Sequence, residues 1–253
     1  MSISGYSPIF TYFDLQLGRP HWREKKVLDF GGNVGNVIRD PNSTVDQSNY
    51  WCLDVSKDAV ERGRQEYPQA HWVFYDRFNW WYNPSGIPGL KIPDLGPKFD
   101  YVLSFSVFTH TNQVEMIELV TSLKTFLAVN GTLAFTFLDP HYRPSEVEED
   151  PRTNLEYYLD TKSDSTIDVD LILERAKNAR WCTVMNYKNL YIEDEDISLT
   201  DQDMMKRAYN DPRYTRSAYD TYYTAEYIKT LFQGAIILPP VNALRQHCCI
   251  LRA

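Results

Sequence analysis

The stretch "KVLDFGGNVGN", residues 26–36, decides the predicted fold. Its first half is a short apolar run that ends in glycines, which is typical of a buried strand. Glycines after a strand let the backbone approach a ligand closely, and a following helix points its first N–H groups at that ligand. The stretch therefore predicts a nucleotide-type cofactor at the end of a buried strand.

Strands and helices alternate along the next hundred residues. A second predicted strand covers residues 50–55, and the helix after it is capped by Ser56 and ended by Pro68. Further strands are predicted at 70–76, at 98–108 and, after an Asn130-Gly131 turn, at 132–138. A helix between residues 111 and 127 is predicted to bury Val114, Ile117, Val120, Leu123 and Leu127. This alternation predicts a parallel sheet with right-handed crossovers.

The alternation stops after residue 140 and returns near the end of the chain. Residues 141–221 contain predicted helices at 168–180 and 200–210, but no strand–helix repeat. A helix at 224–234 then precedes strands at 235–238 and 246–251, which are joined so closely that they must be antiparallel. We therefore expect an N-terminal cap segment (1–25), a core (26–140 and 222–253) and a mainly helical insertion (141–221). Long insertions often form lids, so this one is expected to cover the substrate.

Composition narrows the class of protein. The net charge of −8 repels a phosphate backbone and disfavours a nucleic-acid partner. No apolar run approaches the ~18 residues of a membrane span, and the N-terminus lacks the order of a signal peptide, so we expect a cytoplasmic protein without membrane contact. The cysteines have no metal-type spacing and are expected to be reduced; they are Cys52, Cys182, Cys248 and Cys249.

The choice of cofactor depends on residues near the ends of three predicted strands. A dinucleotide fingerprint needs glycine at the first, third and sixth positions, but the chain has Gly31, Asn33 and Asn36 there. Asp54 ends the second strand, where a carboxylate accepts from the ribose hydroxyls of either cofactor. Asp76 ends the third strand, where a carboxylate can accept from an adenine amine. A nicotinamide oxidoreductase is therefore disfavoured but stays an alternative.

With these motifs in order, the sequence resembles the class I S-adenosylmethionine-dependent methyltransferases of small-molecule type. The resemblance is carried by "VLDFGGNVGN", "LDVSKDAVERGRQEYP", "VFYDRF", "FDYVLSFSVFTH" and "FLAVNGTLAFTF". It covers residues 26–140 and resumes near residue 222. It implies an α/β, Rossmann-like, doubly wound seven-stranded sheet with an antiparallel last strand, and S-adenosyl-L-methionine as the cofactor.

The resemblance also implies roles for residues at the strand ends. Three glycines would line the methionine part, Asp29 would face its ammonium group, and the Ser104–Phe105 backbone would reach toward the same group. The three glycines are Gly31, Gly32 and Gly35. Asp54 would hold the ribose, Asp76 and Arg77 would hold the adenine, and Val55 is a further cofactor-binding position. Asn33 departs from the family, which more often has glycine there. Its side chain either contacts the cofactor or tolerates an unusual turn conformation.

Methyl transfer needs the acceptor atom held close to the methyl carbon and, where the acceptor carries a proton, a base. His110 follows the fourth strand and His141 the fifth, and a histidine suits proton removal from a phenol or alcohol. The alternative for both is a capping or hydrogen-bonding role. A metal site at Asp139 and His141 is disfavoured because two ligands are too few.

Aromatic residues suggest the chemistry of the acceptor. The tyrosine-rich insertion suits an aromatic or cationic small molecule. The acidic stretch 189–203 either attracts an amine or is a solvated surface. Residues 77–84 either line the cofactor or pack in the core. Four aromatic residues are candidates to close over the cofactor from the N-terminal side, namely Tyr6, Phe10, Tyr12 and Phe13.

The predicted function is methyl transfer to an oxygen or nitrogen of a small molecule in specialised metabolism. Oxygen is slightly favoured because two histidines are available as bases. The alternatives are a protein or peptide methyltransferase and a catalytically inactive binding partner with the same fold. Methylation of nucleic acid is disfavoured because the N/D-P-P-Y/F motif is absent after the fourth strand. A homodimer is possible.

Overall fold

A computed structural model of the chain describes residues 8–79, 82–144, 151–162, 169–185, 189–192, 219–241 and 245–253. The chain forms two compact units. The first contains the residues up to Phe105, Thr121–Phe135 and Ile250–Ala253, and the second contains Ser106–Val120 and Thr136–Cys249. Tyr6, the predicted helix at 200–210 and residues 193–203 of the acidic stretch lie outside the described residues.

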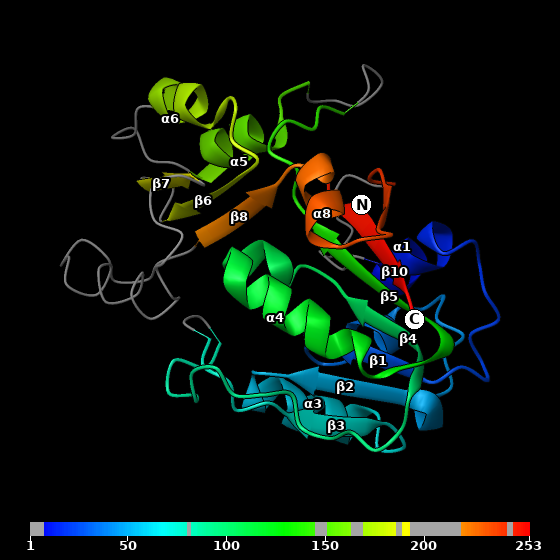
Figure 1. Cartoon of the computed structure of the whole chain (residues 1–253). Coiled ribbons are helices and arrows are strands. Elements are labelled where there is room, and N and C mark those ends of the chain that lie inside the picture. The colour runs from blue at the N-terminus through cyan, green and yellow to red at the C-terminus, as the bar shows by residue number, and fades with distance from the viewer. Residues whose placement is uncertain are drawn as a thin grey trace, which may run out of the picture. The chain divides into compact units, whose positions relative to one another are not determined.

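Seven strands form the main sheet, in the order β3-β2-β1-β4-β5-β10-β9 (Figure 1). Their bounds are β1 Val27–Phe30, β2 Tyr50–Asp54, β3 His71–Phe74, β4 Phe99–Ser104, β5 Leu127–Phe137, β9 Ile236–Leu238 and β10 His247–Arg252. The first five pair in parallel. β10 runs antiparallel to β5, because Ala253 at its end donates to the Gly131 carbonyl near the start of β5, at 3.0 Å. The predicted α/β sheet with an antiparallel last strand is confirmed.

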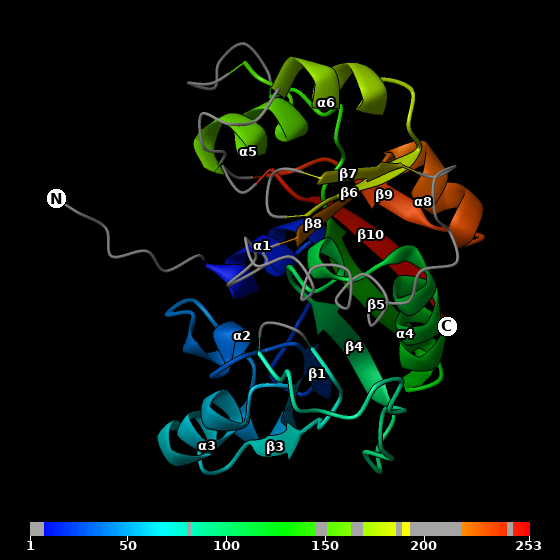
Figure 2. The ribbon, with the colours of Figure 1, turned by 90° about the vertical axis from the view of Figure 1, so that its left-hand side faces the viewer.

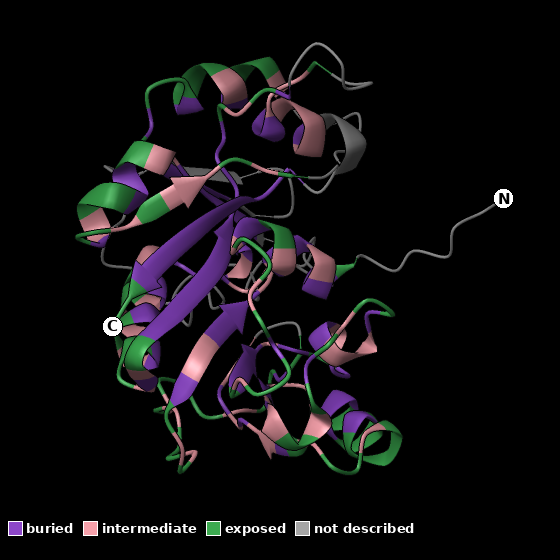
Figure 3. Cartoon of the chain, turned by 90° about the vertical axis from the view of Figure 1, so that its right-hand side faces the viewer, coloured by how far each residue is buried: buried purple, intermediate pink, exposed green. Residues whose placement is uncertain are grey.

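Burial follows the strands of this sheet (Figure 3). All four residues of β1 are buried, as expected for a strand with neighbours on both sides. The four cysteines are buried and free, which confirms the prediction of reduced thiols. Burial raises the pKa of the Cys182 thiol to about 12. Among the described residues, no helix combines the length and apolarity that a bilayer crossing requires.

Helices α1 (Ile9–Gln16), α2 (Asn36–Arg39) and α3 (Lys57–Glu66) and the 3₁₀ turn η1 (Gln47–Asn49) belong to the first unit. The predicted cap of α3 is confirmed, since the Ser56 hydroxyl accepts from the Ala59 N–H at 3.3 Å. The helix ends at Tyr67, as expected before a proline. A Cβ at Gly63 would come within 2.2 Å of the Trp72 ring, so this helix and β3 pack through a glycine.

The aromatic residues of α1 lie in the core of the first unit. Phe10, Tyr12 and Phe13 are at most 3% exposed. The Tyr12 and Phe13 rings meet Phe105, at the end of β4, edge to face with centroids 5.2 and 6.1 Å apart. These aromatic residues therefore fix the segment that follows β4, and their predicted closure over the cofactor stays a prediction.

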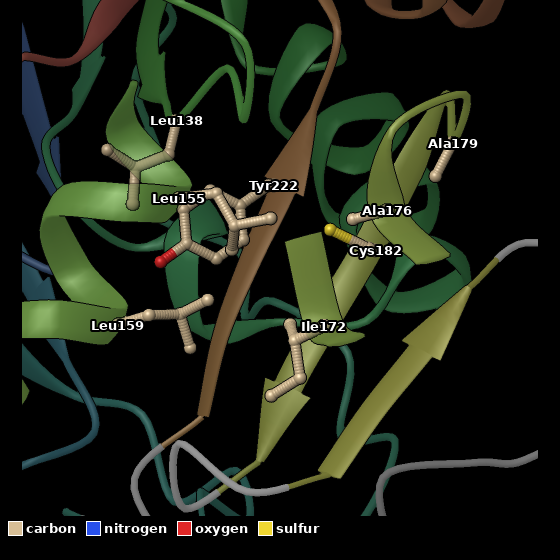
Figure 4. Close-up of a cluster of buried hydrophobic side chains, with 8 residues drawn as sticks. All are labelled: Leu138, Leu155, Leu159, Ile172, Ala176, Ala179, Cys182 and Tyr222. Atoms are coloured by element: carbon tan, nitrogen blue, oxygen red, sulfur yellow. The ribbon is translucent and has the colours of Figure 1, made fainter. Parts of the chain in front are cut away.

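The second unit contains a three-stranded antiparallel sheet with the order β7-β6-β8. The strands of this sheet are β6 (Trp181–Met185), β7 (Asn189–Ile192) and β8 (Tyr219–Tyr223). The same unit contains the helices α5 (Asn154–Lys162), α6 (Val169–Ala176) and α8 (Ala225–Leu231). Helices α5 and α6 lie beside this sheet (Figure 2). They pack on it through Leu138, Leu155, Leu159, Ile172, Ala176, Ala179, Cys182 and Tyr222 (Figure 4).

The prediction of a mainly helical insertion missed this sheet. Helix α6 was expected, but β6, β7 and β8 have only four or five residues each. Over so few residues the hydrophobic period does not distinguish a strand from a helix or loop. In addition, β6 pairs with β8, which follows it only after a long intervening segment, so no local turn signal marks the pairing.

The buried face of helix α4 (Gln113–Lys124) differs from the predicted one. Val114 and Ile117 were expected to be buried, but they are 58% and 36% exposed. Val120, Leu123 and Leu127 are buried as expected, and Met116 and Leu119 are buried in place of the other two. Both sets have helical spacing, so the periodicity predicted the helix correctly but left its rotation open.

The predicted turn at Asn130-Gly131 is an irregularity within β5. The strand begins at Leu127, and its register against β4 shifts between Phe99 and Tyr101. Asn130 has a φ of +62°, a left-handed conformation that asparagine tolerates better than most residues. A Cβ at Gly131 would lie 2.8 Å from two carbonyl oxygens, those of Ala128 and Phe99. The strand therefore continues through the turn signal as a β-bulge.

Gly131→Ala is expected to lower the free energy of unfolding by about 1–3 kcal/mol, because two backbone carbonyls must move to admit the methyl group. Urea denaturation followed by circular dichroism measures the change. Asn130→Gly is the control in the same bulge. It keeps the left-handed conformation accessible and should change stability by less than about 1 kcal/mol. Equal stability of Gly131→Ala and the wild type would contradict the crowding.

Candidate functional site

The loop after β1 turns through three left-handed residues. Gly31, Asn33 and Gly35 have φ values of +76°, +54° and +88°. Such a conformation strains residues with a Cβ, and asparagine is among the few that adopt it readily. Of the two roles predicted for Asn33, the turn conformation is observed. Its side chain is exposed, and contact with the cofactor stays a prediction.

Asp54, at the end of β2, holds this loop in place. One carboxylate oxygen accepts from the Asn33 N–H and the other from the Ser56 N–H, each at 2.7 Å. Burial raises the pKa of Asp54, while the N–H groups of Ser56 and Asn33 oppose the rise. Each carboxylate oxygen has further acceptor capacity, so these bonds leave room for hydroxyl groups of a ligand.

Asp29 lies beneath the loop. It is 1% exposed, and its Oδ2 accepts from the Tyr50 hydroxyl at 2.6 Å and from the Val37 N–H at 3.4 Å. Burial raises the pKa of Asp29 to about 7, although the bonds from Tyr50 and Val37 lower it. A Cβ at Gly32 would lie 2.6 Å from the Asp29 carboxyl group. Gly32 is therefore required for the loop to fold over this acid.

Asp76 and Arg77 organise the loop after β3. The Asp76 carboxylate accepts from the Asn83 amide at 3.0 Å. The Arg77 side chain is buried and donates to the Leu90 carbonyl at 2.9 Å, so it anchors the loop. The Arg77 N–H, the group predicted to meet an adenine ring, donates to the Tyr75 carbonyl at 2.6 Å. A direct role of either side chain toward the cofactor stays a prediction.

Ser104 ends β4, which lies beside β1 in the sheet. It is fully buried, and its hydroxyl has no hydrogen-bond partner among the described residues. A buried hydroxyl without a partner costs free energy, so such groups are uncommon unless a ligand or water completes them. The parallel strands β1, β2 and β4 all end at one edge of the sheet, where ligands of such folds bind.

In the second unit, His110 lies beside an acid that the sequence did not reveal. His110 ends the 3₁₀ turn η2 (Phe108–His110), and its Nδ1 is 3.4 Å from Oδ1 of Asp220 on β8. The Asp220 side chain is 5% exposed and that of His110 is 39% exposed. Asp220 was missed because β8 was not predicted, so nothing in the sequence brought this residue near η2.

The backbone before η2 is strained and held by a buried network. Ser106 has a φ of +55°, which is unfavourable for serine. Its N–H donates to the Thr136 hydroxyl at 2.8 Å, and its own hydroxyl accepts from the Gln246 amide at 2.5 Å. The Thr136 hydroxyl donates to the Gln246 carbonyl at 2.5 Å. This closed triangle fixes the chain that leads to His110.

His141 is placed differently. Its backbone N–H donates to the Asp139 carboxylate at 2.9 Å, and the residue is exposed. The other Asp139 oxygen accepts from the Ala225 N–H, at the start of α8, at 2.8 Å. Asp139 thus joins two chain segments through backbone N–H groups. A catalytic role of His141 stays a prediction.

A family model described as a methyltransferase domain matches residues 28–133, which span the glycine loop, Asp54, Asp76 and Ser104. The resemblance drawn from the five sequence motifs is thereby confirmed. No curated protein shows significant similarity to the sequence.

Solved structures share the fold of this protein over nearly the whole chain. CalS10, an amino pentose methyltransferase from Micromonospora echinaspora involved in calicheamicin biosynthesis, is 13% identical, with a TM-score of 0.54 over 98% of this chain and 93% of that one. An S-adenosylmethionine-dependent methyltransferase from Clostridium acetobutylicum is 10% identical, with a TM-score of 0.52 over 99% and 93%. CcbJ from Streptomyces caelestis is 12% identical, with a TM-score of 0.51 over 98% and 97%. At these identities the likeness shows the fold alone.

The stability of the protein should depend on pH through Asp29. Its carboxyl group ionises near the ordinary pKa of 3.8 in the unfolded chain but near 7 in the folded one. Between these values the folded state binds more protons, so the free energy of unfolding falls as the pH rises from about 4 to 7. In Asp29→Asn this component is absent, and the slope between pH 5 and 7 should flatten.

Urea unfolding at several pH values measures the slope. Asp46→Asn is the control, because hydrogen bonds from Ser48 lower the pKa of Asp46 and place its effect below pH 4. That variant should keep the wild-type slope between pH 5 and 7. An unchanged slope in Asp29→Asn would mean that Asp29 ionises normally.

Proposed function

We propose that the chain transfers a methyl group from S-adenosyl-L-methionine to an oxygen or nitrogen atom of a small molecule in specialised metabolism. The observation that carries the proposal is the loop Gly31–Gly35 held by Asp54 at the end of β2. Within a methyltransferase domain, this arrangement presents a carboxylate with spare acceptor capacity beside a glycine loop that a ligand can approach closely.

S-adenosyl-L-methionine is the predicted cofactor, and the methyltransferase-domain match supports it. The described residues fit it: the left-handed glycine loop for the methionine part, Asp54 for the ribose, and Asp76 for the adenine. The unpartnered Ser104 hydroxyl is a donor that a bound group would complete. Asp29, with a pKa of about 7, can lose its proton and become negatively charged when a cationic ammonium group lies near it.

The cofactor, when bound, supplies a methyl group on a positively charged sulfur atom. The chain has two tasks toward the acceptor, which are to position it and to remove a proton from it. We assign removal of the acceptor's proton to His110, because a buried carboxylate adjoins its ring while the ring itself is partly exposed. Oxygen stays slightly favoured over nitrogen as acceptor, since a histidine base matters most for a hydroxyl group.

A small-molecule acceptor is favoured over a macromolecule by two observations. The net charge of −8 opposes nucleic acid, and CalS10, which shares the fold, acts on an amino pentose. We propose that the insertion, residues 141–221, covers this acceptor. In the part of it that the structure describes, Leu155 and Ile172 belong to an apolar cluster that also includes Leu138 and Tyr222 on either side of the insertion.

Calorimetric titration with S-adenosylhomocysteine, with NADH run beside it, tests the cofactor first. Micromolar binding of S-adenosylhomocysteine alone is expected. Binding of NADH alone would favour an oxidoreductase instead. Mass spectrometry of phenols, alcohols and amines incubated with the protein and S-adenosyl-L-methionine then tests methyl transfer. Cofactor binding without transfer to these compounds or to peptides would favour an inactive binding partner.

Asp54→Ala should weaken S-adenosylhomocysteine binding by about 1–3 kcal/mol, through the lost hydrogen-bond acceptor and the loosened loop. Calorimetry gives the affinity. Ser56→Ala is the matched control, because it removes the hydroxyl that caps α3 but leaves the Asp54 carboxylate and its N–H donors. That variant should lose stability and keep its affinity. Unchanged affinity in a folded Asp54→Ala would remove Asp54 from the site.

His110→Gln should lower turnover by about 10²–10⁴-fold, the usual effect of losing a general base, while S-adenosylhomocysteine affinity stays at the wild-type value. Single-turnover methyl transfer to the best acceptor from the screen measures this. His141→Gln is the companion variant. The histidine whose loss lowers turnover is the base, so a fall confined to His141→Gln would move the role to that residue.

A further inference from the structure

The His110 ring is held by a strand that belongs to the insertion. Its Nδ1, rather than its Nε2, lies 3.4 Å from the Asp220 carboxylate on β8. Asp220 is 3% exposed and pairs in register with Val184 of β6, which fixes its backbone. A buried carboxylate at one ring nitrogen attracts a proton to that nitrogen, because the carboxylate is an acceptor only.

Several contacts hold β8 against the segment around His110. The Tyr223 hydroxyl donates to the Thr111 carbonyl at 3.4 Å, directly after His110 in the chain. The Tyr223 N–H donates to the Leu138 carbonyl at 2.8 Å, which ties β8 to the end of β5. In α4, Gln113 donates to the hydroxyl of Tyr227 on α8. The titratable side chains that these contacts bring to the segment are Asp220, Tyr223 and Tyr227.

We infer that Asp220 is a positioning residue that keeps the neutral His110 ring in the Nδ1–H form, so that Nε2 carries the lone pair that takes the acceptor's proton. The inference rests on the proposed role of His110. In the step, the acceptor's O–H or N–H bond breaks, and its proton moves to Nε2. The electron pair of that bond remains on the acceptor atom, which would form the new bond to the methyl carbon as the bond from that carbon to sulfur breaks and its electron pair leaves with S-adenosylhomocysteine. Asp220 adjoins the imidazolium that results.

The insertion, residues 141–221, thus contributes to the proposed catalysis through Asp220. His110 follows the fourth strand of the main sheet. The acid that orients the base therefore comes from a segment outside the matched methyltransferase domain, residues 28–133.

The tautomer of His110 tests the inference without any acceptor. Two-bond ¹H–¹⁵N correlation spectra of the full-length protein distinguish Nδ1–H from Nε2–H in the neutral ring, and His110→Gln assigns the signal. The wild type should show the Nδ1–H form. In Asp220→Asn the amide can donate to Nδ1, so the population should move to Nε2–H. Nε2–H in the wild type, or an unchanged tautomer in the variant, would overturn the inference.

Two controls separate this role from a structural one. Tyr223→Phe removes another bond between β8 and the His110 segment but keeps the carboxylate, so it should retain the Nδ1–H signal. S-adenosylhomocysteine binding and thermal unfolding report whether each variant is folded. If Asp220→Asn fails to fold, Asp220→Glu provides the second variant. It keeps the charge and should keep Nδ1–H, and loss of that form in folded Asp220→Glu would contradict the assignment.

The inference about the tautomer and the proposed function can each be rejected without the other. A wild type with Nδ1–H and no methyl transfer to any compound would leave the Asp220–His110 pair intact and reject the proposed reaction. Methyl transfer with His110 in the Nε2–H form would reject the pair and leave the reaction intact. Once an acceptor is known, Asp220→Asn should lower kcat at least tenfold with little change in KM.

Discussion

The two hydrogen bonds accepted by Asp54 are the constraint on which the cofactor loop depends. One bond comes from Asn33 in the loop after β1, and the other from Ser56 at the start of the helix after β2. A single buried carboxylate therefore sets the position of both segments. Because a lost partner would leave buried N–H groups unsatisfied, the arrangement resists small displacements. This rigidity is what a site needs if it is to hold a cofactor in one orientation.

Asp54 and Asp29 lie on neighbouring strands and accept hydrogen bonds from different kinds of donor. Burial raises the pKa of both Asp54 and Asp29, and the N–H groups of Ser56 and Asn33 oppose the rise at Asp54. Asp29 receives its shortest bond from the Tyr50 hydroxyl and titrates near neutrality. The pair thus combines an acid committed to the loop with one whose charge can respond to a cation. Gly32 makes this possible, since any side chain there would collide with Asp29.

The second unit holds its histidine by a different physical means. Ser106 adopts a left-handed conformation, and the cost is offset by a closed network with Thr136 and Gln246. Strained backbone of this kind persists only where the surroundings determine it strongly, and it is frequent near functional sites. Downstream, Asp220 fixes the ring of His110. Backbone strain, a polar network and a buried acid therefore all converge on a segment of a few residues.

The sequence by itself determined what chain neighbours decide: the strand before Gly31, the cap at Ser56, and through these the domain and its cofactor. Only the tertiary structure decided which face of α4 is buried, that β6, β7 and β8 form a sheet, and that Asp220 meets His110. The reason is physical. Turns, caps and amphipathic periods are set by interactions a few residues apart, whereas strand pairing and buried acid–histidine contacts join residues that no local pattern relates. Their register is fixed by packing, which the folded chain alone specifies.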